Sequence, residues 1–157
     1  MATIPVTFEV YSTPWHTQKR LDGLADEKLM SFDTETRGVY TAAERKEAQK
    51  ALDRGDLDKA TRKLASLIAN SSGLSFPSLV NVTHFIFGLS KSHSVIFIAQ
   101  HPQDEFLIWN WLAKYEGHLL IHNSLFDLKL MRHRVGCIPR SFDDTALLAK
   151  TLINNAD

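Results

Sequence analysis

The chain has few of the features that reinforce small proteins, since its 157 residues include a single cysteine, Cys137. One cysteine excludes an internal disulfide framework and is typical of a reducing compartment. The chain also lacks an excess of either charge, with 18 basic and 18 acidic residues. It therefore has no general attraction for phosphate, and any nucleic-acid site has to be local. At this length a hydrophobic core stabilises a fold without disulfides or a structural metal.

Long apolar runs are absent as well. The longest, at residues 95–99 and 119–121, fall far short of the ~20 residues that cross a bilayer. Residues 1–11 lack a basic stretch followed by an apolar one, so no secretory signal is expected. Neither a glycine-rich phosphate loop nor a Gly-x-Ser-x-Gly turn occurs, so nucleotide kinases and serine hydrolases have no support.

Strand and helix patterns alternate along the chain, which predicts a mixed α/β fold. Strands are predicted over residues 6–11, 28–32, 82–89, 95–100 and 118–121, and helices over 18–27, 104–115, 124–134 and 146–152. Phe106 in the second of these helices and Leu125 in the third are expected to face the core, because they begin apolar repeats at helical spacing.

Residues 41–70 predict a helical hairpin. Thr41 and Glu44 form a capping box at its start, and Asp56 is placed to cap its second helix. Basic and acidic residues are mixed along it, which indicates either a solvated face with ion pairs or a surface that attracts phosphate or a partner. We predict one domain over residues 1–157, with a helical insertion at 41–72.

Three acids lie where strands or neighbouring helices bring side chains together. Asp33 and Glu35 follow the strand at 28–32, and Asp127 lies in the first turn of the helix after the strand at 118–121. Asp33 and Glu35 are two apart, so they project from one face of an extended segment. Like charges that close need a cation, and hard oxygen ligands suit Mg²⁺ or Mn²⁺, which support phosphoryl displacement.

Three segments set these acids in a wider context: Phe-Asp-Thr-Glu-Thr at 32–36, Ile-His-Asn-Ser-Leu-Phe-Asp-Leu at 121–128 and Phe-Asp-Asp-Thr-Ala-Leu-Leu-Ala at 142–149. Together they resemble the 3′-to-5′ exonuclease domain of the DEDD (DnaQ-like, ribonuclease H-like) superfamily, most closely the proofreading domain of family A, phage-type DNA polymerases. The resemblance runs from residue 8 to 152 and is interrupted by the hairpin. It implies a ribonuclease H-like mixed sheet with flanking helices.

The resemblance also implies roles for single residues. Asp33 looks like the metal-bridging carboxylate, Glu35 like its partner near the terminal 3′ hydroxyl, and Asp127 like the third metal ligand. Thr36 and Asn123 resemble the positions that contact the last two nucleotides of the unpaired strand. The implied cofactor is Mg²⁺ or Mn²⁺.

One part of the family pattern is missing. Family members have a third motif, Tyr-x-x-x-Asp or His-x-x-x-Asp, and this sequence contains neither. Asp144 resembles a strand-to-helix junction and is expected to cap a helix. The resemblance therefore implies a fold truncated at its C-terminus and an incomplete two-metal site, with a large loss of rate for the chain alone.

Two hypotheses of different classes follow. In the first, the chain is a 3′-to-5′ exonuclease of the proofreading type that acts on single-stranded DNA 3′ ends. The fourth carboxylate would come from a second polypeptide of a split DNA polymerase or from a longer chain. In the second, it is a catalytically inactive module whose hairpin binds a polymerase, DNA or a host protein. RNA stays open as a substrate. We expect the protein to be located in the cytoplasm, that of a host cell if the chain is phage-encoded. We expect no membrane partner.

Overall fold

A computed structural model describes residues 5–71 and 77–154 of the chain. The chain forms two compact units: one combines Met1–Glu35 with Val82–Asp157, and the other is Thr36–Asn81. The single domain with an insertion at 41–72 stays a prediction, and residue 72 lies outside the described residues.

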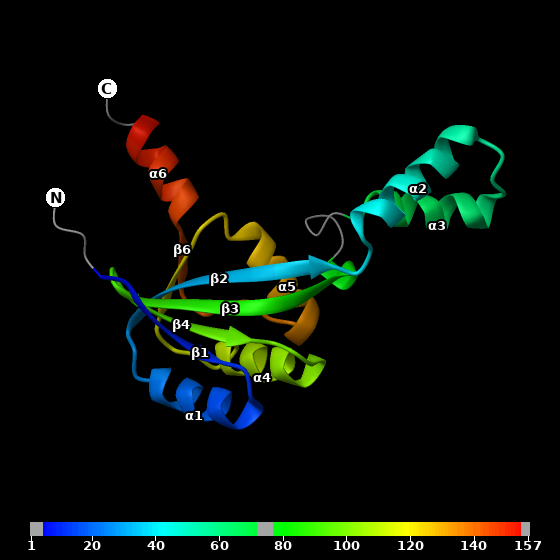
Figure 1. Ribbon diagram of the computed structural model, residues 1–157. Helices are drawn as coiled ribbons and strands as arrows, with labels where there is room; N and C mark the ends of the chain where they lie inside the picture. Colours follow the sequence, from blue (N-terminus) through cyan, green and yellow to red (C-terminus); the bar gives the residue numbers. More distant parts are fainter. Residues whose placement is uncertain (1–4, 72–76, 155–157) are drawn as a thin grey trace. The chain divides into compact units, whose positions relative to one another are not determined.

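Six strands form a mixed sheet in the order β1-β4-β3-β2-β5-β6 (Figure 1). The strands are β1 (Thr7–Tyr11), β2 (Leu29–Gly38), β3 (Val80–Ser90), β4 (His93–Ile98), β5 (His118–Ile121) and β6 (Phe142–Asp144). β3 and β4 pair antiparallel, whereas β1 pairs parallel with β4, β2 with β5, and β5 with β6. The carboxyl ends of β2, β5 and β6 therefore point to the same edge of the sheet.

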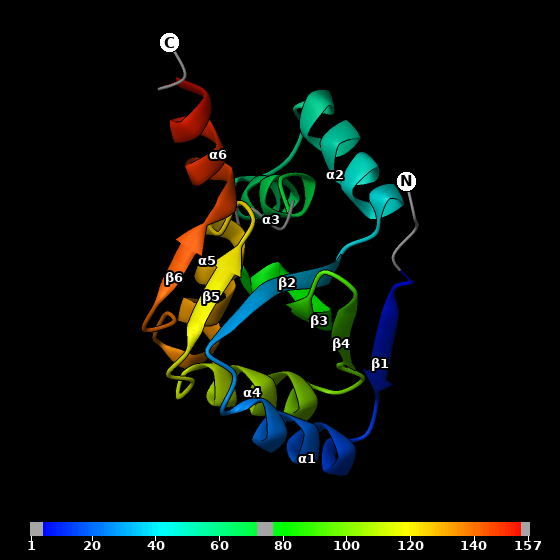
Figure 2. The same cartoon turned by 90° about the vertical axis from the view of Figure 1, so that its left-hand side faces the viewer.

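Helices cover one face of this sheet (Figure 2). The first unit contains α1 (Pro14–Leu24), α4 (Pro102–Leu112), α5 (Leu125–Val135) and α6 (Thr145–Asn154). α4 lies between α1 and α5 and contacts both. α1 begins four residues before the predicted position 18, because a proline fits the first turn of a helix, where its missing N–H has no partner to lose. In the described part of the chain no helix has the length and apolar character that crossing a membrane requires.

The core lies between the sheet and this helix layer. Trp109 of α4 is fully buried, with its ring centroid 4.8 Å from that of Phe85 and 6.0 Å from that of Phe32. The core positions predicted for Phe106 and Leu125 are wrong, since these side chains are 60% and 57% exposed. Each helix buries the side chains next to these positions instead. On α5 the buried residues are Asp127, Leu130 and Met131, and the apolar pattern of the sequence does not include Asp127.

The second unit confirms the predicted hairpin. It contains α2 (Ala42–Arg54), α3 (Lys59–Ala69) and the short 3₁₀ helix η1 (Pro77–Leu79). The Thr41–Glu44 capping box is present, and α2 ends at Gly55 in the left-handed conformation. The cap predicted at Asp56 is wrong: Asp58 accepts the Ala60 N–H at 2.8 Å and the Thr61 N–H at 3.1 Å, so the loop is two residues longer than the sequence pattern indicates.

Candidate active site

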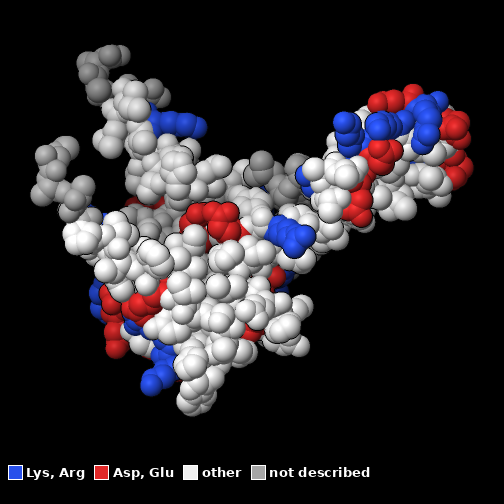
Figure 3. All heavy atoms as spheres, in the orientation of Figure 1, with Lys and Arg blue, Asp and Glu red and all other residues white. Residues whose placement is uncertain are grey.

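Asp33 and Glu35 lie inside β2. The strand was predicted to end at Phe32, where its pairing with β5 does end, yet it continues to Gly38. β3 lies along its other side, and the Thr83 hydroxyl donates to the Glu35 carbonyl at 3.0 Å. Strand alternation leaves both carboxylates exposed and buries Phe32 and Thr34. Acidic side chains lie together over the sheet in the region of β2 (Figure 3).

Asp127 lies in the first turn of α5, on the side of the helix that is buried. Its side chain is 3% exposed, and the hydroxyl of the buried Thr34 donates to its Oδ1 at 2.6 Å. This hydrogen bond joins the middle of β2 to the start of α5. The carboxylate predicted from the second motif is therefore held against the strand that carries the first motif.

The charge of Asp127 is disfavoured in this environment. Burial raises the pKa of its carboxyl to about 6, the Thr34 hydrogen bond lowers it, and the negative charge of Asp33 raises it further. No Lys or Arg in the described ranges forms an ion pair with Asp33, Glu35 or Asp127.

Asp33 and Glu35 share the exposed face of β2, whereas Asp127 contacts the buried Thr34 between them. Among residues 5–71 and 77–154, no three His, Cys, Asp or Glu side chains are grouped so that they could hold a metal ion. The predicted ligand set of Asp33, Glu35 and Asp127 therefore stays a prediction.

The two predicted substrate contacts lie in different units. Asn123 is exposed in the turn between β5 and α5, and its φ of 54° lies in the left-handed region that few residues other than glycine adopt. Thr36 is half-buried on β2, at the start of the second unit. Their roles in binding nucleotides stay predictions.

Asp144 acts as the expected helix cap. Its Oδ1 accepts the N–H groups of Ala146 at 2.9 Å and Leu147 at 3.3 Å, in the first turn of α6. Burial opposes its charge, but hydrogen bonds from Ser124, Ala146 and Leu147 outweigh it and lower the pKa of Asp144 to about 2.

Sequence reasoning missed Thr34 and Ser124. Thr34 continues the buried alternation of Met30 and Phe32, so a polar residue at a core position was the available signal. Ser124 directly precedes α5, which is the ordinary place of a capping residue, but its hydroxyl donates to Asp144 instead of capping its own helix.

No protein-family model and no curated protein matches this chain. Solved structures do match it. The Aedes aegypti Nibbler EXO domain has a TM-score of 0.58 at 9% identity, over 99% of this chain and 62% of that one. Brucella melitensis NrnC bound to pGG has a TM-score of 0.51 at 14% identity, over 99% and 56%. Trypanosoma brucei RNase D in complex with GMP has a TM-score of 0.58 at 13% identity, over 92% and 35%.

The chain thus spans less than two thirds of the length of these solved proteins. At such low identity the likeness establishes the fold alone, a ribonuclease H-like mixed sheet with flanking helices. It confirms the predicted fold class. The closer resemblance to the proofreading domains of family A polymerases stays a prediction.

Proposed function

We propose that this chain is the core of a metal-dependent exonuclease that removes nucleotides from single-stranded 3′ ends. The observation that supports this most is the 2.6 Å hydrogen bond that holds the buried Asp127 of α5 against Thr34, the residue between Asp33 and Glu35 on β2. No basic side chain of the described residues forms an ion pair with any of the three acids, and carboxylates without a cation of the protein favour the binding of an external one.

The donor set fits a hard divalent cation. Asp33, Glu35 and Asp127 offer only carboxylate oxygens, which are the ligands that Mg²⁺ and Mn²⁺ prefer. When bound, such an ion lowers the pKa of an attacking water and stabilises charge on the phosphate. NrnC has been solved with bound Mg²⁺, which supports the same choice here.

A neighbouring residue orients Asp127 and favours its ionised form. Thr34 fixes the orientation of Asp127 through its 2.6 Å hydrogen bond and favours the ionised carboxylate that a metal requires. The ionised form prevails above pH ~6, so metal binding and turnover are expected to rise with pH through that region. In the first unit, Glu35 and Asn123 would contact the last nucleotides, as the resemblance implies.

We further propose single-stranded DNA as the substrate, as the resemblance to proofreading domains implies. Nucleic acids bound to two of the solved neighbours support a nucleic-acid end in general: NrnC holds pGG, and RNase D was solved with RNA U12. RNA is therefore the alternative substrate, and the assay has to compare it with single-stranded DNA.

A second polypeptide, or a longer chain, would supply the missing fourth carboxylate. Two uncovered apolar surfaces in the first unit support this. On α6, Leu148, Leu152 and Ile153 are exposed, and on β1 so are Phe8 and Val10. Contiguous exposed apolar side chains of this kind are typical of a surface that another polypeptide covers.

The test is an assay with 5′-labelled single-stranded DNA and RNA, in Mg²⁺ or Mn²⁺, with and without a polypeptide carrying a Tyr-x-x-x-Asp segment. We expect stepwise shortening from the 3′ end and a loss of roughly 10²-fold or more in Asp33→Ala. Asp26→Ala changes an exposed acid that lies before the start of β2 and outside the candidate site, so it is the control and should retain full activity. Shortening that survives Asp33→Ala, or no shortening under any of these conditions, would contradict the proposal.

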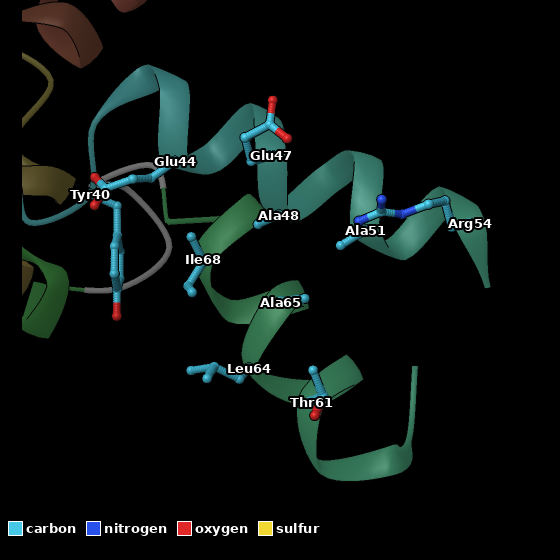
Figure 4. A pocket seen from close by; sticks show the side chains of 10 residues that line it. All are labelled: Tyr40, Glu44, Glu47, Ala48, Ala51, Arg54, Thr61, Leu64, Ala65 and Ile68. Atoms are coloured by element: carbon cyan, nitrogen blue, oxygen red, sulfur yellow. The ribbon is translucent and has the colours of Figure 1, made fainter. Parts of the chain in front are cut away.

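A groove in the hairpin favours the inactive binding module as a second candidate. Figure 4 shows side chains of α2 and α3 lining a pocket of about 470 Å³. Its walls are mostly apolar, with Ala48 and Ala51 from α2 and Leu64 and Ile68 from α3. On the face that Figure 3 shows, Lys and Arg of the hairpin lie beside Asp and Glu. These features suit a segment of a partner protein, such as a polymerase, better than a phosphate backbone.

Leu64→Asp separates the two candidates, because Leu64 lines the groove and is 53% exposed. The module hypothesis predicts that this change abolishes capture of a purified DNA polymerase and that Asp33→Ala leaves capture intact. Ser66→Asp places the same charge on an exposed position of α3 outside the groove and serves as the control. Equal capture by all variants would exclude the groove as the binding site.

A further inference from the structure

Asp144 lies where two helices of the first unit begin. It is the last residue of β6 and pairs with Ile121, the last residue of β5. Beyond Ile121 the chain makes the turn that contains Asn123 and Ser124 and enters α5, whose first turn carries Asp127. Beyond Asp144 the chain enters α6. A side chain at this position can therefore reach the start of both helices.

The two oxygens of Asp144 divide between these helices. Oδ2 accepts both the N–H of Ser124 at 2.8 Å and its hydroxyl at 2.9 Å. Oδ1 accepts the N–H groups of Ala146 and Leu147 in α6 and, at 3.2 Å, the N–H of Asn123. Capping of α6 needs only the bonds from Ala146 and Leu147, so the bonds from Asn123 and Ser124 are additional to the cap.

The turn held by Asp144 needs such support. Asn123 adopts a left-handed conformation, which costs energy for residues other than glycine, although less for asparagine than for most. Ser124 makes no capping bond to its own helix, and Asp144 accepts the N–H of Ser124, which directly precedes α5 and has no acceptor within the helix. The negative charge of Asp144 is also favourable at the positive end of the α5 dipole.

We propose that Asp144 is a positioning residue of the candidate site, one that fixes the Asn123 turn and thereby the place of Asp127. It touches neither metal nor substrate. It holds the start of α5 in register with β5, so that Asp127 meets Thr34 and Asn123 keeps its exposed position. This role rests on the proposed function, in which Asp127 is a metal ligand whose position matters.

Asp144→Ser separates positioning from capping. Serine is as good a helix cap as aspartate, so the start of α6 remains satisfied. The serine oxygen is bonded directly to Cβ, one carbon nearer the backbone than the aspartate oxygens. It therefore does not reach the N–H and hydroxyl of Ser124. We expect amide hydrogen exchange at Asn123 and Ser124 to accelerate roughly tenfold or more, while Leu130 in the middle of α5 keeps its protection. Mn²⁺ affinity should fall by up to about 10-fold, the low end of the range for direct partners of metal ligands, because Asp144 acts on Asp127 through the start of α5.

The controls decide between outcomes. Asp143→Ser alters the neighbouring exposed acid, which contacts His118 only among the described residues, and should change neither exchange at the turn nor Mn²⁺ affinity. A purely structural Asp144 would lower the melting temperature in Asp144→Ser and leave Mn²⁺ affinity unchanged, and that result would overturn the positioning role. Unchanged exchange at Asn123 and Ser124 would overturn it too. A wild-type chain that binds no Mn²⁺ would overturn the proposed function. Hydrogen exchange at Asn123 and Ser124 needs no metal, so it still tests whether Asp144 holds the turn.

Discussion

Asp127 is the residue at which stability and the proposed activity oppose each other. Its carboxyl is buried, and one hydroxyl, that of Thr34, offsets the loss of water. Between its ordinary pKa of 3.8 and its folded value of about 6, the folded state holds a proton that the unfolded state has released. The free energy of unfolding therefore falls as pH rises through this interval, and above pH ~6 the full penalty is present.

We predict that Asp127→Asn stabilises the metal-free chain at pH 8. The amide is neutral, fits the same space and still accepts the Thr34 hydrogen bond. The gain should reach up to about 3 kcal/mol, as a shift of this size implies, and should shrink as pH falls towards 4. Urea unfolding in EDTA at several pH values measures it, with Asp26→Asn as an exposed control. A destabilised Asp127→Asn, or a gain independent of pH, would contradict this account of the site.

The sequence predicts the candidate site in outline at this scale. Asp33, Glu35 and Asp127 are predicted as ligands from strand ends and helix starts, and this set stays a prediction, since Asp33 and Glu35 lie inside β2. The inward direction of Asp127 was not predicted, because it depends on the rotation of α5 against the sheet, which Leu130 and Met131 set by packing. Thr34 was missed for the same reason, since its partner lies 93 residues away.

At the scale of elements, local signals predict the hairpin better than the sheet. The capping box of α2 lies within four consecutive residues and was predicted correctly. The end of β2 was not, because a strand continues for as long as a neighbour supplies hydrogen bonds, and β3 follows it from far along the chain.

Two glycines give predictions of opposite sign. Gly55 ends α2 with φ of 78°, so Gly55→Ala should destabilise the hairpin by about 1 kcal/mol even though nothing obstructs the added methyl. Gly23 lies within α1, and a Cβ there meets only an ordinary contact with Arg20, so Gly23→Ala should stabilise α1 by about 0.5–1 kcal/mol. Native-state hydrogen exchange in α2 and α1 measures both, and the same sign for the two changes would refute this assignment of backbone conformation.

At the scale of the whole molecule, the fold and the proposed activity depend on different residues. The fold is similar to those of solved proteins at 9–14% identity, with TM-scores of 0.51–0.58. The proposed chemistry depends on a few acids of the first unit, which come from β2 and α5. The hairpin of the second unit accounts for none of them and offers a groove of its own.

The central claim is that Asp33, Glu35 and Asp127 bind a divalent ion, and Mn²⁺ anomalous scattering from a crystal of the chain tests it most directly. We predict an anomalous peak within coordination distance of an Asp33 carboxylate oxygen and of at least one oxygen of Glu35 or Asp127, absent in Asp33→Asn. A crystal in which Mn²⁺ binds elsewhere, while all three carboxylates stay without it, would contradict the claim.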